Sequence, residues 1–283
     1  MKVEGDKEMV YEMLVLDLDG TLTNSRKEIT EPTKKALIEI QEAGKKVVLA
    51  SGRPINGVQP LADALELGRF GSYILSFNGA RITQCSTGEI IYNKTIPHDV
   101  IEPIYQIAKQ YKDVDIITYQ GDEIISGLQP NQYTEKERMI NKMKIKPVEH
   151  FSEYIDFPVN KLLIPGEPVI LEEMMEVLKA KFHSLLNIYR SEPFFLEIMP
   201  QKIDKAYTLQ KLLSSIGLTA DQMICCGDGY NDLSMIEYAG LGVAMENAQP
   251  IVKEKADYIT RSNDDDGVLY VINQFMRNNS KRI

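Results

Sequence analysis

The stretch that decides the fold is YEMLVLDLDGTLTNS, residues Tyr11 to Ser25. Its short apolar run from Met13 to Leu16 predicts a β-strand that is buried on both faces of a sheet. Asp17 ends this run and Asp19 follows two residues later. Two carboxylates about 4 Å apart repel by about 4 kcal/mol at an effective dielectric of about 20, so we expect a cation nearby. By itself, the stretch could also be an ordinary Asp-Gly turn closing a strand.

The sequence that follows alternates between predicted helices and strands. Helical patterns cover residues 30–44 and 55–65, and the apolar runs KVVLA and YILS predict strands at residues 46–50 and 73–76. This alternation predicts an α/β fold with a parallel sheet covered by helices. Ligands bind at the carboxyl ends of such strands, where Asp17, Ser51 and Asn78 are found.

The middle of the chain has a different pattern. A predicted hairpin across Ser86 to Gly88 is followed by mixed helices and alternating strands, which predict a separate α+β domain. The parallel-sheet pattern then resumes with a helix starting at Asp204 and a buried strand ending at Asp228. We therefore predict a core domain formed by residues 1–81 and 192–283, with a second domain, residues 82–191, inserted between them.

Composition narrows the possible classes of protein. The chain has 283 residues and 43% hydrophobic residues, which is enough for a sizeable core, and its formal charge of −9 argues against nucleic-acid or anionic-membrane binding. The 3 cysteines form no disulfide or metal pattern, so we expect a cytoplasmic protein. The polar first nine residues do not have the pattern of a signal peptide, and no apolar run is long enough to span a membrane.

Asp228 offers a second carboxylate for the cation that the repulsion at Asp17 led us to expect. Both carboxylates end buried strands at one edge of the predicted sheet, and such a pair can hold a hard divalent cation such as Mg²⁺. Ser51 offers a hydroxyl and a loop N–H to a phosphate, and Lys205 offers a positive charge. Taken alone, Lys205 would be a solvated surface lysine and Ser51-Gly52 an ordinary turn.

Together these groups predict a mechanism for phosphoryl transfer. Asp17 can attack phosphorus and form an aspartyl-phosphate, and Asp19 can protonate the leaving oxygen and then deprotonate water. Ser51, Lys205 and the cation would neutralise charge on the phosphoryl oxygens. Asn231 and Asp232 can orient the metal ligands or their waters, and Asp232 can also cap a helix.

Six segments carry a family resemblance. DLDGTLT (17–23), SGR (51–53), Lys205 and GDGYND (227–232) resemble the four ordered motifs of the haloacid dehalogenase superfamily of phosphohydrolases. FNGA (77–80) and EPFFLEIMP (192–200) resemble its Cof-type subfamily IIB, in which an α+β cap is inserted into a Rossmann-like core. Ala206 departs from the subfamily, which commonly has glycine after the motif lysine.

The resemblance implies the same roles for the residues. Asp17 would be the nucleophile and Asp19 the acid/base, while Ser51, Gly52, Lys205 and Asn231 would bind or support the phosphoryl group. Mg²⁺ would be bound by the side chains of Asp17 and Asp228 and by the backbone carbonyl of Asp19. The cap would act as a lid that reads the leaving group, with Arg53 and Asn78 near its mouth.

We therefore expect a cytoplasmic, Mg²⁺-dependent phosphatase, a monomer or small homo-oligomer, that acts on small phosphorylated metabolites. Sugar phosphates and phosphorylated cofactors such as pyridoxal phosphate or flavin mononucleotide are the expected substrates. A phosphosugar mutase would use the same aspartyl-phosphate. A module that only stores phosphate on Asp17, or a metabolite sensor, fits less well, because neither needs the acid/base Asp19 or a lid.

Overall fold

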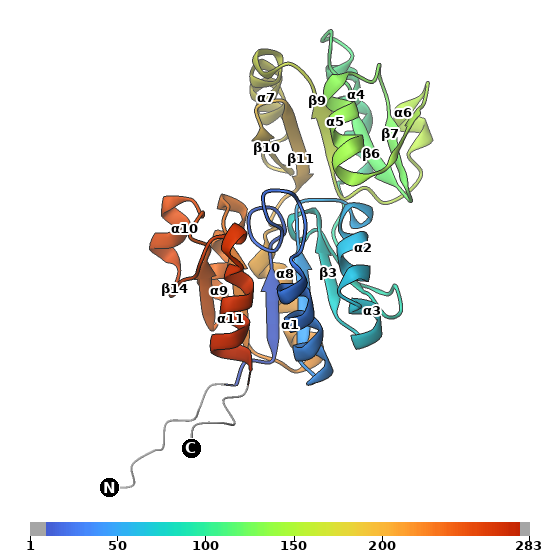
Figure 1. Cartoon of the computed structure of the whole chain (residues 1–283). Coiled ribbons are helices and arrows are strands. Elements are labelled where there is room, and N and C mark those ends of the chain that lie inside the picture. Colours follow the sequence, from blue (N-terminus) through green and yellow to red (C-terminus); the bar gives the residue numbers. More distant parts are fainter. Residues whose placement is uncertain (1–9, 278–283) are drawn as a thin grey trace, which may run out of the picture. The chain divides into compact units, whose positions relative to one another are not determined.

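The computed structural model describes residues 10–277, so our expectation for the first nine residues lies outside the described part. The chain forms two compact units. Within the described residues, the first unit comprises residues 10–51, 61–92 and 204–277, and the second comprises Gly52–Pro60 and Asn93–Ile203. Each unit contains its own sheet, and Figure 1 labels the elements.

The sheet of the first unit has the strand order β14-β13-β12-β1-β2-β3-β4-β5. Its strands are β1 (Met13–Leu16), β2 (Lys46–Ala50), β3 (Tyr73–Ser76), β4 (Arg81–Gln84), β5 (Ile90–Asn93), β12 (Met223–Gly227), β13 (Leu241–Ala244) and β14 (Tyr258–Ile259). The pairs from β14 to β3 are parallel, and β4 is antiparallel to β3. The predicted α/β fold with a parallel sheet is confirmed.

Helices flank this sheet and connect its strands. They are α1 (Glu31–Glu42), α3 (Leu67–Phe70), α8 (Lys205–Ile216), α9 (Leu233–Tyr238), α10 (Pro250–Lys255) and α11 (Gly267–Val271). Helix α2 (Ile55–Ala64) spans the division of the chain, because its residues up to Pro60 belong to the second unit. Helix α1 begins as its sequence predicts, because the Thr30 side chain accepts the N–H of Thr33 and Pro32 occupies the first turn. Its buried residues Ala36, Leu37 and Ile40 recur at helical spacing.

The second unit is an α+β structure with the strand order β10-β11-β9-β6-β7-β8. Its strands are β6 (Ile117–Gln120), β7 (Glu123–Ser126), β8 (Lys144–Pro147), β9 (Leu162–Pro165), β10 (Leu186–Glu192) and β11 (Phe195–Pro200). Its helices are α4 (Ile101–Ala108), α5 (Gln132–Asn141), α6 (Phe151–Tyr154) and α7 (Pro168–Phe182). All strand pairs here are antiparallel except β7 with β8.

The sheets divide the chain differently from our expectation at both junctions. The hairpin β4–β5, which we predicted in the inserted domain, extends the first sheet because β4 pairs with β3. Strand β11, which we predicted in the core, pairs with β9 and β10 in the second sheet. Alternation along a strand shows which face is buried but not which neighbour it pairs with. The functional domain limits at residues 81 and 191 stay a prediction.

Two further local differences have physical causes. The sequence from Glu135 to Ile145 has a helical pattern, but the helix there begins earlier, at Gln132, and ends at Asn141. Asn131 caps its first turn in a capping box with Thr134, which fixes the earlier start. Lys142 then adopts φ 54°, and β8 follows. Within residues 10–277, none of the helices combines the length and apolar character needed to span a membrane.

Candidate active site

The site in the first unit is built at the carboxyl ends of three adjacent strands. Strand β1 lies between β2 and β12, so Asp17, Ser51 and Asp228, which follow these strands, come to the same edge. The N–H of Asp17 donates to the Cys226 carbonyl at 3.1 Å, which continues the parallel ladder. The predicted convergence of these side chains therefore holds within this unit.

Lys205 is the cation that the paired aspartates require. It is the first residue of α8 and is fully buried, and its Nζ donates to Asp17 Oδ1 at 2.7 Å and to Asp232 Oδ1 at 2.6 Å. A third bond, to the Ala50 carbonyl at 2.8 Å, joins it to the end of β2. The alternative of a solvated surface lysine is therefore excluded, and the ammonium is held at a fixed point.

The charges in this cluster perturb one another. Burial, reinforced by the Asp232 carboxylate, raises the pKa of Asp17 well above its usual range, although Lys205 opposes this shift. Burial alone would lower the pKa of Lys205, but Asp17 and Asp232 outweigh it and raise the pKa above its ordinary value. Lys205 therefore stays charged at neutral pH.

Asp228 completes an acidic group that could hold a metal ion. Carboxylate oxygens of Asp17, Asp228 and Asp232 lie within 4.8 Å of one another. Burial, followed by the Asp232 charge, raises the pKa of Asp228 to about 6. Three carboxylates around the single ammonium of Lys205 leave excess negative charge, which a divalent cation with oxygen ligands would balance. The residues present therefore fit such a cation.

Asp232 has a larger part in this cluster than the sequence indicated. Besides its bond to Lys205, its Oδ2 accepts the N–H of Asp228 at 3.0 Å and of Gly229 at 2.9 Å. It therefore fixes both the lysine and the turn that carries Asp228. The sequence signal for this role was the position of Asp232, four residues after Asp228 in the turn that follows a buried strand. With both of its oxygens engaged, Asp232 positions the site, and the predicted ligands Asp17 and Asp228 remain the candidates for the metal.

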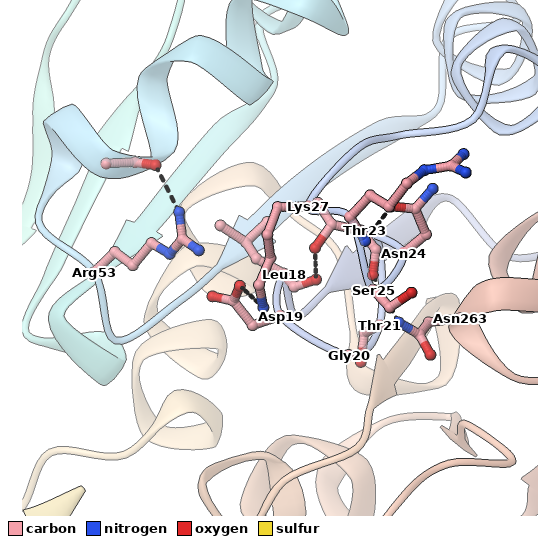
Figure 2. Close-up of polar contacts among 12 residues, drawn as sticks. Leu18, Asp19, Gly20, Thr21, Thr23, Asn24, Ser25, Lys27, Arg53 and Asn263 are labelled. Carbon is pink, nitrogen blue, oxygen red and sulfur yellow. Dashed lines mark hydrogen bonds and ion pairs between the residues drawn. The ribbon is translucent and has the colours of Figure 1, made fainter. Parts of the chain in front are cut away.

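The turn after Asp19 approaches Asp228 closely. Gly20 has φ 86°, and a Cβ at this position would lie 2.4 Å from Asp228 Oδ2, so only glycine fits here. The Thr21 hydroxyl donates to Asp228 Oδ1 at 3.0 Å. The Asp19 carboxylate accepts from Lys27 Nζ at 2.8 Å (Figure 2), a contact that the sequence did not predict.

Ser51, Asn78 and Asn231 form the other predicted side of the site. Ser51 is buried, and its N–H donates to the Leu75 carbonyl at 2.9 Å, so our expectation needs a correction. The N–H offered to phosphate cannot be that of Ser51, which leaves its hydroxyl and the Gly52 N–H as candidates. The Asn78 N–H donates to the Ser51 carbonyl at 2.9 Å, and Asn231 Nδ2 donates to Asn78 Oδ1 at 3.3 Å.

Gly52 and Arg53 belong to the second compact unit. Within that unit, Arg53 Nη1 donates to the Gly57 carbonyl at 3.5 Å, and the Gly52 carbonyl accepts from Lys161 Nζ at 3.3 Å. Lys161 is itself buried and forms an ion pair with Glu197 at 3.5 Å. The predicted roles of Gly52 and Arg53 in phosphate or substrate binding stay predictions.

Comparison with known proteins identifies the family. The model of the haloacid dehalogenase-like hydrolases matches residues 14–272. The chain belongs to this family. A putative phosphatase of Bacillus subtilis, YxeH, is 30% identical over 94% of this chain and 99% of its own length. The phosphatase YcsE of the same organism, named for 5-amino-6-(5-phospho-D-ribitylamino)uracil, is 30% identical over 93% of this chain and 95% of its own length.

Solved structures agree with this assignment. A haloacid dehalogenase-like hydrolase from Bacteroides thetaiotaomicron is 47% identical, with a TM-score of 0.90 over 93% of this chain and 98% of that protein. The subclass IIB sugar phosphatase BT4131 is 26% identical, with a TM-score of 0.78 over 93% of this chain and 98% of its own. The predicted superfamily, the IIB subfamily and the enzyme class, a phosphatase of this superfamily, are confirmed.

Proposed function

We propose that this protein is a cytoplasmic, Mg²⁺-dependent phosphatase that hydrolyses small phosphorylated metabolites through a phosphoryl group carried on Asp17. The observation that carries this proposal is the buried cluster at the strand ends. Lys205 holds one oxygen of Asp17 at 2.7 Å, and the Asp228 carboxylate lies within 4.8 Å of the same group. A fixed carboxylate beside a cation and a second acidic ligand is suited to attack a phosphate.

In the first step, a carboxylate oxygen of Asp17 attacks phosphorus and the ester P–O bond breaks. Asp19 gives its proton to the leaving oxygen, so the alcohol is released neutral. Lys205 keeps the attacking carboxylate oriented through its bond to Oδ1. The Ser51 hydroxyl, the Gly52 N–H and Asn231 would bind the phosphoryl oxygens.

In the second step, Asp19 takes a proton from a water molecule whose oxygen attacks the same phosphorus. The bond between phosphorus and Asp17 breaks, inorganic phosphate is released, and both carboxyl groups return to their starting states. Asp17, Asp228 and the Asp19 carbonyl would hold Mg²⁺, which when bound would supply positive charge to the phosphoryl oxygens.

The relatives support a class of leaving group. YcsE is named for a phosphorylated ribitylamino compound and BT4131 for sugar phosphates, so both names describe phosphate esters of polyhydroxylated alkyl chains. We propose the same class here, with phosphorylated cofactors such as flavin mononucleotide or pyridoxal phosphate as further candidates. The second unit would provide the lid, with Arg53 and Asn78 near the substrate, and the protein would act as a monomer or small homo-oligomer.

The test is phosphate release from sugar phosphates, the phosphorylated ribitylamino compound, nucleotides and phosphorylated cofactors, each with Mg²⁺ or with a chelator. Native protein should release phosphate only with the metal, and Asp17→Asn should lower the rate by at least about 1,000-fold. Asp204→Asn is the matched control, because this helix cap is outside the cluster and asparagine caps equally well.

Two results would overturn the proposal. The first is release of as much phosphate by Asp17→Asn as by native protein, and the second is no release from any compound by metal-loaded native protein. An isomerised product without phosphate release would instead assign the mutase reaction.

A further inference from the structure

The loop between β1 and α1 carries a rigid turn at residues 24–28. The buried Asn24 accepts the N–H groups of Arg26 and Glu28 through Oδ1, both at 3.0 Å. The Lys27 N–H donates to the Asn24 carbonyl at 2.9 Å. An asparagine side chain that bonds two following N–H groups fixes the turn, so the backbone of Lys27 has little freedom.

Neighbouring loops fix the β1–α1 loop at three further points. Asn247 Nδ2 donates to the Gly20 carbonyl at 2.8 Å, and Asn263 Nδ2 donates to the Thr23 carbonyl at 2.9 Å. The N–H of Ser25 donates to Asp264 Oδ1 at 2.8 Å. Figure 2 shows Asn263 beside this loop, with Lys27 directed toward Asp19. The turn is therefore fixed relative to the strand end that carries Asp17 and Asp19.

Lys27 holds an unfavourable backbone conformation in this turn. Its φ is 63°, in the left-handed region that glycine enters without steric cost and lysine does not. From this backbone, its Nζ reaches Asp19 Oδ1 at 2.8 Å. The adjacent Arg26 instead pairs with Glu28 at 3.0 Å. A strained residue at a reactive carboxylate points to a function for its side chain.

We propose that Lys27 is a positioning residue for Asp19, and this inference rests on the proposed phosphatase function. Lys27 binds Oδ1 of the carboxyl group and thereby orients the group for proton exchange with the leaving oxygen and then with water. The rigid turn means that little side-chain and backbone freedom has to be lost when the ion pair forms. Removing the ammonium loosens this orientation, and proton transfer to the leaving oxygen then slows.

Leaving-group dependence distinguishes this role from a structural one. An alkyl phosphate needs a proton on its leaving oxygen, whereas p-nitrophenyl phosphate releases a stable phenolate and needs it far less. Lys27→Met should lower kcat/KM on the best alkyl phosphate by about tenfold, part of the 10²–10⁴-fold that general acid catalysis supplies, because this ratio covers the steps up to departure of the leaving group. The loss of kcat/KM on p-nitrophenyl phosphate should be under about threefold, because the later attack of water on the aspartyl-phosphate, which both substrates share, does not enter this ratio.

Three further variants complete the test. Lys27→Gly relieves the positive φ, so it should show the same loss of kcat/KM on the alkyl phosphate while its melting temperature stays at or above the native value. Lys27→Arg should recover part of the alkyl activity, because arginine keeps the charge. Arg26→Met removes a charge from the same turn and should behave like native protein with both substrates.

Several outcomes would overturn the inference. These are a Lys27→Met kcat/KM on the alkyl phosphate at or above the native value, equal losses of kcat/KM on both substrates, or losses that follow a lowered melting temperature in Lys27→Gly. Asp19→Asn separates this inference from the proposed function. If it loses the alkyl activity and Lys27→Met does not, only the role of Lys27 fails. Native protein inactive on both substrates would overturn the phosphatase proposal and this inference together.

Discussion

Two lysine–aspartate pairs at one strand end differ in burial far more than in length. Lys205 and Asp17 lie 2.7 Å apart with side chains 0% and 10% exposed, whereas Lys27 and Asp19 lie 2.8 Å apart with side chains 62% and 38% exposed. Although the two ion pairs are almost equally long, their loss should change the free energy of unfolding by very different amounts. Removing a partner from a buried pair leaves a charge without solvent, while water solvates the remaining charge of an exposed pair.

The difference matches the parts we assign to the two aspartates. In the proposed mechanism, Asp17 attacks phosphorus from one fixed position, and its buried ion pair with Lys205 restrains it there. Asp19 exchanges protons with the leaving group and then with water in the same mechanism, so its carboxyl group has to be accessible to both. The predictions below follow the same contrast from the buried pair to the exposed one.

Lys205→Met should have the largest effect on stability. It leaves Asp17 and Asp232 buried together without their shared cation, so we expect a loss of about 3–5 kcal/mol in the free energy of unfolding. Urea unfolding of metal-free protein measures this loss. Lys211→Met, at an exposed position of the same helix, is the control and should change stability by less than about 0.5 kcal/mol. Equal stabilities of the two variants would contradict the assigned burial.

Asp232→Asn should have the second largest effect. The amide keeps the shape of the carboxylate but loses its charge, and its NH₂ group cannot accept from Lys205 or from the turn N–H groups. We expect a loss of about 1.5–3 kcal/mol, the usual range for hydrogen bonds to a charged group. Asp204→Asn provides the same substitution at a helix cap and should be nearly neutral. Similar losses in both variants would show that Asp232 is not specially engaged.

The sequence predicted the buried pair better than the exposed one. Apolar runs that end in aspartate show where parallel strands terminate, and neighbouring strand ends meet at one edge. The position of Lys205 followed from its motif, but its full burial did not, because a lysine at a helix start is usually solvated. Asp232 was named only as a possible support, since sequence spacing does not show which oxygen bonds to which donor.

Lys27 was missed because its contact depends on backbone conformation. A lysine in a polar turn is ordinary, and only its φ of 63° and the bonds of Asn24 direct its side chain to Asp19. The hairpin β4–β5 was misplaced for a related reason. Alternation predicts a strand and its faces, but the pairing with β3 forms through tertiary contacts.

The third predicted effect is on Mg²⁺ affinity, because protons compete with the cation for the Asp228 carboxylate. Its pKa in the metal-free protein is raised to about 6, so below this pH a cation must displace a proton. Protonation of Asp228 should therefore lower Mg²⁺ affinity by about tenfold per pH unit below 6, and this contribution should level off above it, while the raised pKa of Asp17 adds to the slope. Titration calorimetry between pH 5 and 8 measures this dependence. Asp228→Asn should bind Mg²⁺ weakly and lose this part of the slope, and equal native affinities at pH 5 and 7 would contradict the shift.

Lys27→Met should have the smallest effect on stability, although we expect it to slow the reaction. Exposed ion pairs contribute about 0.2–1 kcal/mol, and salt screens them further. We expect urea unfolding to show a loss below about 1 kcal/mol that shrinks between low and 0.5 M salt. Arg26→Met removes another exposed pair from the same turn and should give a similar small change. A loss of about 3 kcal/mol would mean that Lys27 supports the fold as Lys205 does. The small value would instead show that the fold gains little from this strained lysine, so that a loss of kcat/KM in Lys27→Met, absent in Arg26→Met, is assigned to the chemistry of Asp19.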